Sequence, residues 1–121
     1  MTFRFRQFPV YQEAKKLHRE IVLLTNKFPS QFYYLKDQIN RSSLSVVLNI
    51  AEGSSKRSDK DLNRYLENSM GSVNETVSAL EISLDCNLVS KIKFDELDLR
   101  CEQVVKQLGG FSRSLFVKKK L

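Results

Sequence analysis

The stretch LENSMGSVNETVSALEISL, residues 66–84, repeats apolar residues at alternating intervals of four and three. Six successive positions follow this rule without a miss: Leu66, Met70, Val73, Val77, Leu80 and Leu84. An α-helix places residues three and four apart on one face, so the stretch predicts a helix with a continuous apolar stripe. Heptad spacing of this kind favours packing in a left-handed helical bundle.

The residues before this stretch indicate where its helix begins. Gly53 and the polar residues up to Ser58 are typical of a short linker. Ser58 and Asp61 have the spacing of a capping box, with Asp in place of the usual Glu. We therefore expect the helix over residues 59–86, with Ser58 as its N-cap.

Two further helices are predicted on the N-terminal side. Residues 9–28 carry one apolar stripe, with Pro9 at the first helical position and Pro29 just beyond the end. Residues 31–52 form the next helix, with Ser30 as N-cap and Gly53 as the stop. Its segment 44–51 is apolar or small nearly all round, which is typical of a helix buried on two sides. We expect that excess apolar surface to serve a subunit interface.

A fourth helix is predicted over residues 91–116, where the pair Gly109-Gly110 favours a kink or fraying. Its apolar stripe consists of Phe94, Leu97, Cys101, Val104, Leu108, Phe111 and Leu115. Four helices with short connections predict an all-α fold, an up-down-up-down four-helix bundle in a single domain over residues 1–121. A basic tail follows at residues 117–121.

Composition narrows the functional classes. The 121 residues carry a net charge of +6 at pH 7, and 41% of them are hydrophobic, which disfavours disorder. No apolar run is long enough for a membrane span, and the N-terminus has no signal-peptide core, so we expect a cytoplasmic protein. The sole histidine, His18, and the cysteines Cys86 and Cys101 build neither a disulfide framework nor a zinc site.

Several short motifs point to one family. Phe28-Pro29 is followed by the strings YLxxQIxRSSxS from residue 34, NIAEG at 49–53, RYL at 64–66 and GSxxE at 71–75. The chain thereby resembles the bacterial four-helix-bundle family encoded by intervening sequences of 23S rRNA genes, over roughly residues 8–115. Two departures are Asn40-Arg41, where the family often has two basic residues, and the lack of proline between Ser45 and Asn49.

The resemblance implies a four-helix protomer that assembles as a ring-like homopentamer, without established enzymatic activity and without a cofactor. A relative of that family, the accessory protein of diversity-generating retroelements, is a basic pentameric barrel that binds nucleic acid and works with a reverse transcriptase. We therefore expect no catalytic site, no metal and no membrane partner in this chain.

Polar members of the motifs fall within the most apolar predicted helix. Asn49 and Glu52 need partners if they are buried, and Arg41 and Glu75 are the candidates. We expect these four residues to form a structural polar network. The alternative is a catalytic carboxylate pair of Glu52 and Glu75, but the Glu-x-x-His pairs typical of di-metal bundles are missing from the sequence.

Basic residues gather in several short clusters. Residues 65–90 hold four acidic residues and no Lys or Arg, so charge is segregated along the chain. Arg4 and Arg6 alternate with phenylalanines that either stack on bases or pack on the bundle. The candidate nucleic-acid contacts are Arg41, Lys56, Arg57, Lys60, Arg64, Lys118, Lys119 and Lys120. We predict non-catalytic binding of nucleic acid, structured RNA above all; the alternative is a protein-interaction module that serves a reverse transcriptase or another enzyme.

Overall fold

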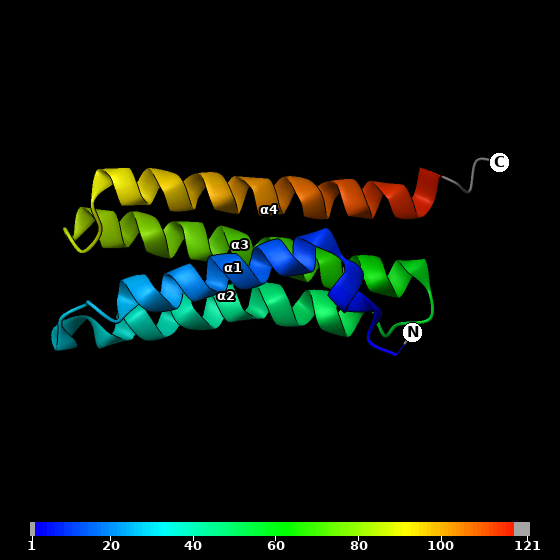
Figure 1. Ribbon diagram of the computed structural model, residues 1–121, viewed down its shortest axis with the longest axis horizontal. Coiled ribbons are helices and arrows are strands. Elements are labelled where there is room, and N and C mark those ends of the chain that lie inside the picture. Colours follow the sequence, from blue (N-terminus) through cyan, green and yellow to red (C-terminus); the bar gives the residue numbers. More distant parts are fainter. Residues whose placement is uncertain (1, 118–121) are drawn as a thin grey trace.

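Four long helices make up most of the computed structural model, which describes residues 2–117 (Figure 1). They are α1 (Pro9–Thr25), α2 (Tyr33–Gly53), α3 (Asp59–Asp85) and α4 (Lys91–Val117), with short 3-10 turns at Arg4–Gln7 (η1) and Ser30–Phe32 (η2). No strand occurs within the described residues. The predicted all-α class with four helices is therefore confirmed.

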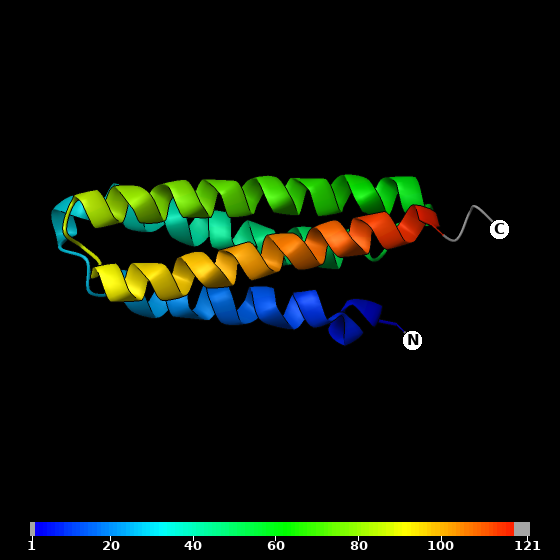
Figure 2. The same ribbon diagram turned by 90° about the horizontal axis from the view of Figure 1, so that it is seen from above.

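The four helices lie side by side, and consecutive helices run in opposite directions (Figures 1 and 2). Short connections explain this, because a few residues cannot carry the chain back to the starting end of a long helix. The first residues of the chain, the α2–α3 connection and the end of α4 consequently lie at one end of the molecule. The α1–α2 and α3–α4 connections lie at the other end.

The core follows the apolar stripes of the sequence. Each helix contributes fully buried side chains, the largest of which are Leu17, Ile21, Ile39, Ile50, Leu66, Leu80, Leu97 and Leu108. Met70, Val77 and Leu84 of the predicted α3 stripe are only partly buried and pack at the edge of this core. Burial of apolar surface at about 25 cal/mol per Å² is the main term that holds the helices together.

Helix ends differ in part from the sequence prediction. Ser58 caps α3 as expected, since its Oγ accepts a hydrogen bond from the Asp61 backbone N–H at 3.1 Å. The first helix ends at Thr25 rather than at residue 28, and Ser30 belongs to a 3-10 turn and caps no helix. The pair Gly109-Gly110 neither ends nor frays α4, which continues to Val117.

Hydroxyl groups line the contact between α2 and α3, and the apolar pattern of the sequence did not indicate them. Ser69 Oγ donates to the Val46 carbonyl at 2.8 Å, and Ser42 Oγ lies 2.8 Å from Thr76 Oγ1. Gly53 is buried and has no positive φ; a Cβ there would stand 2.8 Å from Cβ of Tyr65. Small side chains therefore let the two helices approach closely, and we call this contact the α2–α3 seam.

The outward side of α2 carries apolar residues that the bundle leaves uncovered. Leu44 is 40% exposed and Leu48 is 55% exposed, although both fall in the segment predicted to be buried on two sides. Within residues 2–117 the protomer itself therefore covers only part of that segment. No helix among these residues has an apolar stretch long enough to cross a membrane.

Candidate nucleic-acid interface

The antiparallel arrangement brings basic residues from distant parts of the sequence to one end of the molecule. Figures 1 and 2 place η1, the α2–α3 connection, the first turns of α3 and the last turns of α4 at this end. We call the end the basic pole and define it by the side chains of Arg4, Arg6, Lys56, Arg57, Lys60, Arg64 and Arg113. The predicted contacts Lys118, Lys119 and Lys120 lie outside the described residues.

The N-terminal arm, residues 2–8, is fixed to this pole. Arg4 Nε donates a hydrogen bond to the Ser54 carbonyl at 2.8 Å, which ties η1 to the end of α2. Phe5 packs edge-on against Tyr11 at 4.8 Å between ring centroids, and Phe8 packs likewise against Phe111 at 5.0 Å. The arm therefore packs on the bundle through two of its three phenylalanines.

The cluster at the α2–α3 connection lies at the surface, with Arg57 and Lys60 exposed and Lys56 partly exposed. Lys56 Nζ lies 5.1 Å from the centre of the Tyr65 ring, a cation–π contact that leaves its charge uncompensated. Arg64 approaches the same ring at 5.6 Å and reaches Asp61 at 3.7 Å. Lys56, Arg57 and Lys60 form no ion pair with a carboxylate among the described residues. These three cations are therefore available to phosphates.

Arg41 lies apart from the basic pole. Its side chain is exposed in the middle of α2 and pairs weakly with Asp37 at 3.8 Å. Gly53 at the end of α2 comes twelve positions after Arg41, a distance of roughly 18 Å along the helix axis. The structure therefore brings Arg64 into the cluster at the connection but leaves Arg41 out of it.

The four residues expected to form a polar network make no hydrogen bond or ion pair with one another within residues 2–117. Arg41 pairs with Asp37, as described above. The Asn49 amide donates to the carbonyl and the hydroxyl oxygen of Ser45 at 2.9 and 3.0 Å. Glu52 accepts a hydrogen bond from the Tyr65 hydroxyl at 3.3 Å, and Glu75 accepts one from the Gln38 amide at 2.7 Å. The network prediction is thus corrected for the protomer. The reason is the register of the antiparallel α2–α3 pair, which sets Glu52 beside Tyr65 and Glu75 several turns away beside Gln38.

These signature residues instead share the outer face of the α2–α3 pair. A shallow cleft of about 300 Å³ runs along α2, lined by Arg41, Leu44, Ser45, Leu48, Asn49 and Glu52. A second cleft of about 410 Å³ lies between the two helices and includes Tyr34, Gln38, Glu75 and Ile82. We call this surface the outer α2–α3 face. It combines exposed leucines with polar groups, and in that respect it is similar to protein–protein contact surfaces.

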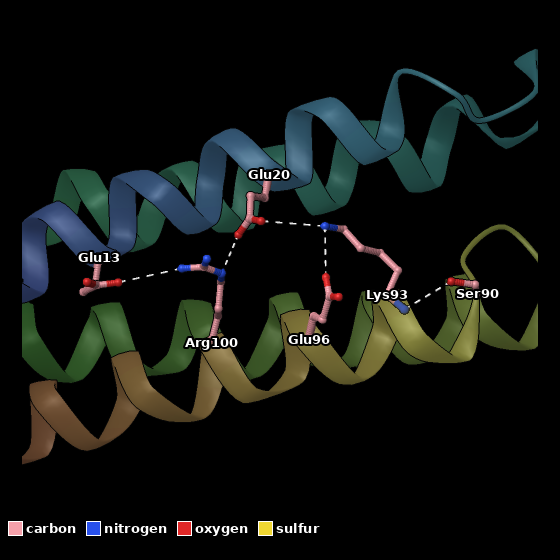
Figure 3. A network of polar contacts seen from close by, with 6 residues as sticks. All are labelled: Glu13, Glu20, Ser90, Lys93, Glu96 and Arg100. Atoms are coloured by element: carbon pink, nitrogen blue, oxygen red, sulfur yellow. Dashed lines mark hydrogen bonds and ion pairs between the residues drawn. The ribbon is translucent and has the colours of Figure 1, made fainter.

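Ion pairs connect α1 with α4 on another side of the bundle (Figure 3). Glu20 Oε2 is buried and accepts no well-aligned hydrogen bond, but Arg100 Nε lies 2.6 Å away and compensates its charge. Lys93 Nζ approaches Glu20 at 3.7 Å and Glu96 at 3.4 Å, and Arg100 also reaches Glu13 at 3.9 Å. We call this contact the α1–α4 seam.

Two ionisable side chains inside the bundle, His18 and Cys101, have shifted pKa values, and the described residues hold no cluster of metal ligands. His18 Nδ1 lies 2.7 Å from Ser43 Oγ, and burial lowers the pKa of His18 below its usual 6.5. Burial, reinforced by the Asp98 charge, raises the pKa of the Cys101 thiol to about 12, which keeps it protonated. Within residues 2–117, no three His, Cys, Asp or Glu side chains gather to hold a metal ion.

Within residues 2–117 the chain is a small all-α protein of four long helices, with basic side chains gathered at one end and exposed leucines on one face. Its family follows from comparison: residues 6–110 match the 23S rRNA-intervening sequence protein family, and the chain belongs to that family. The match covers most of the chain, including the motifs at 49–53 and 71–75. A comparison with curated proteins gives no match.

Proposed function

We propose that this protein binds nucleic acid without catalysing a reaction, and that the basic pole is its contact surface for structured RNA. The observation that carries the proposal is the convergence of four chain segments on one pole, with Lys56, Arg57 and Lys60 left unpaired by carboxylates among the described residues. Such cations displace counterions from phosphates, so binding is strongly salt-dependent and largely independent of sequence.

The test is fluorescence anisotropy with two unrelated RNAs and one duplex DNA at low and moderate salt. A triple variant that combines Lys56→Ala, Arg57→Ala and Lys60→Ala removes three positive charges from the pole. Each lost phosphate contact flattens the plot of log K against log salt by about 0.7 to 0.9. We expect weaker binding to all three ligands by a similar factor.

A matched control removes the same charge elsewhere. Arg19, Lys27 and Lys36 lie away from the basic pole and form no ion pair within residues 2–117. Their joint replacement by alanine should leave affinity and salt slope close to wild type. Equal losses in both triple variants would mean that total charge, not the pole, governs binding. An unchanged salt slope in the Lys56, Arg57 and Lys60 variant would remove the pole as the contact surface.

The active form in this proposal is a homo-oligomer, with a ring-like pentamer of up-down-up-down bundles favoured by the family resemblance. The exposed Leu44 and Leu48 support the outer α2–α3 face as the contact between copies. An assembly of five protomers multiplies the +6 charge of one chain fivefold, which strengthens attraction to RNA.

Multi-angle light scattering tests this assembly. We expect a species several times larger than the 14.1 kDa chain, and Leu44→Glu with Leu48→Glu should dissociate it. The control variant Ile92→Glu with Leu99→Glu changes two exposed apolar residues of α4 and should leave the assembly intact. A 14.1 kDa wild-type species at micromolar concentration would contradict the proposal.

The second candidate function is that of an accessory subunit to a reverse transcriptase or another enzyme. The outer α2–α3 face supports it, because exposed leucines beside polar groups suit a protein partner as well as a second copy. Absence of RNA binding by the wild type at low salt would favour this candidate over the first.

A further inference from the structure

An apolar cleft opens at the basic pole between the start of α1 and the end of α4. Its volume is about 470 Å³, which lies within the range of small-ligand pockets. Phe8 and Phe111 supply aromatic walls, Gly110 supplies a wall without a side chain, and Gln107 and Ser114 add polar groups. We call it the α1–α4 cleft.

The glycines of α4 have no packing reason inside the protomer. Glycine destabilises a helix interior relative to alanine, and α4 contains two in succession. A Cβ at Gly109 would first meet Arg113 Nη1 at 3.4 Å, and one at Gly110 would meet Arg113 Nη2 at 3.9 Å. Both atoms belong to the Arg113 guanidinium, the movable end of a long side chain, so alanine fits at either position. At Gly110 the glycine instead keeps the cleft open.

The walls of the cleft suit a flat aromatic ligand. The Phe8 and Phe111 rings meet edge to face, with centroids 5.0 Å apart and planes at 85°, so each ring keeps a face free of its partner. The Gln107 amide makes no hydrogen bond within residues 2–117, and an amide of this kind recognises the edge of a base. Aromatic stacking of bases is tolerant of sequence.

The charges around the cleft select a ligand that carries phosphates. The Arg113 guanidinium stands beside Gly109 and Gly110, and the Arg4 guanidinium lies 5.8 Å from the centre of the Phe8 ring. An apolar cleft with a guanidinium group near each of two lining residues, Phe8 and Gly110, is complementary to a base with its flanking phosphates. It is not complementary to an uncharged apolar peptide.

We infer that the α1–α4 cleft receives an unpaired base of the bound strand, so that the protein prefers single-stranded segments or loops to continuous duplex. The inference rests on the proposed nucleic-acid binding and specifies its ligand. A paired base inside a duplex cannot enter the cleft, whereas the phosphates of either form contact the basic pole.

The experiment compares a single-stranded RNA with a blunt duplex of equal length by fluorescence anisotropy. Gly110→Leu fills the cleft and should weaken single-strand binding about tenfold, a loss within the range for one stacked base. Duplex binding should stay within about twofold, since stacking makes no contribution there. The control Gly109→Leu adds the same side chain one residue away, outside the cleft lining. Any displacement of the neighbouring Arg113 affects both ligands alike, so the preference for single strand over duplex should stay near wild type.

A second measurement uses a fluorescent base analogue, 2-aminopurine, placed in the single strand. Its emission should fall on binding to wild type and to Gly109→Leu, but not on binding to Gly110→Leu, and thermal melts establish that all three proteins are folded. Equal losses for strand and duplex, or quenching that survives Gly110→Leu, would overturn the cleft inference while the proposed function stands. Absence of binding to either RNA would overturn both.

Discussion

The α2–α3 seam and the α1–α4 seam close the same bundle in opposite ways. Across the α2–α3 seam, serine and threonine hydroxyls form hydrogen bonds with each other or with the facing backbone. Because Gly53 has no Cβ, Tyr65 of α3 packs closely against it. Across the second, Glu20, Lys93 and Arg100 reach over on long side chains (Figure 3). The second seam has a cleft near each end, of about 690 Å³ beside Lys27 and Lys93 and about 470 Å³ beside Phe8. Short side chains with satisfied hydrogen bonds allow two helices to pack closely, whereas long charged side chains join helices that leave clefts between them.

Among the substitutions that test this comparison, Gly53→Ala should have the largest effect on stability. The added Cβ would lie 2.8 Å from Tyr65 Cβ and 3.0 Å from Leu62 Cδ1, so the α2–α3 seam must open. We expect the free energy of unfolding to fall by about 1–3 kcal/mol, as for other overpacked sites. Urea denaturation measures this.

The matched control is Gly71→Ala, because a Cβ there meets nothing within 4 Å. It should raise stability by up to about 1 kcal/mol through helix propensity alone. Equal effects of the two substitutions would show that the α2–α3 seam is not closely packed.

Two buried serines of α3 sharpen the comparison further. Ser69 donates across the seam to Val46, whereas Ser83 donates to Ala79 within its own helix. Ser69→Ala should lower the free energy of unfolding by about 1 kcal/mol, since it removes a bond between helices. Ser83→Ala should cost less, and the thermal melting points of the two variants give the order. The reverse order would contradict a role for the hydroxyl bonds in joining α2 to α3.

The α1–α4 seam should respond to salt where the α2–α3 seam does not. Glu20→Gln removes the shared partner of Lys93 and Arg100 and should cost about 0.5 kcal/mol at low salt. The loss should shrink in salt of about 1 M, which screens partly exposed charges. Urea titrations at two salt concentrations measure it, with the exposed Glu96→Gln as control. A loss that salt leaves unchanged would point to packing rather than charge.

A third contact, between α1 and α2, adds a dependence on pH. Because burial lowers the pKa of His18 in the folded chain, the unfolded chain binds a proton first as pH falls. Stability is therefore full above about pH 6.5 and is lost as pH falls through the lower folded-state pKa. His18→Asn should flatten the profile of melting temperature between about pH 7 and pH 5.5, a range that precedes most carboxylate titration. An unchanged profile would exclude His18 as the group responsible.

The sequence predicted the helices because apolar spacing is local information. The stripe from Leu66 to Leu84 and the cap at Ser58 required only neighbouring residues, and both helix and cap are present. The register of α2 against α3 was not predictable in this way. It depends on hydroxyls such as Ser69 and Thr76, which a polarity pattern counts as solvent-facing although they are buried.

The candidate site likewise combines residues that are close in the sequence with residues that only the fold brings together. Lys56, Arg57 and Lys60 are close in sequence, so their proximity needed no fold. Their meeting with Arg4 and Arg113 needed the antiparallel order of the helices. The α1–α4 cleft carried a weaker signal in the sequence, the pair Gly109-Gly110 inside a helix, which had suggested a kink instead.

The antiparallel order of the helices also determines which groups produce the positive potential at the basic pole. The first turns of α1 and α3 meet the last turns of α2 and α4 there, so two positive and two negative helix-dipole ends lie together and largely offset each other. The attraction for anions consequently originates in lysine and arginine side chains, which are long and movable, and not in fixed backbone amides. A surface of this kind adapts to phosphates at different spacings, and glutamates in place of Lys56, Arg57 and Lys60 would cancel most of its positive charge without disturbing the helices.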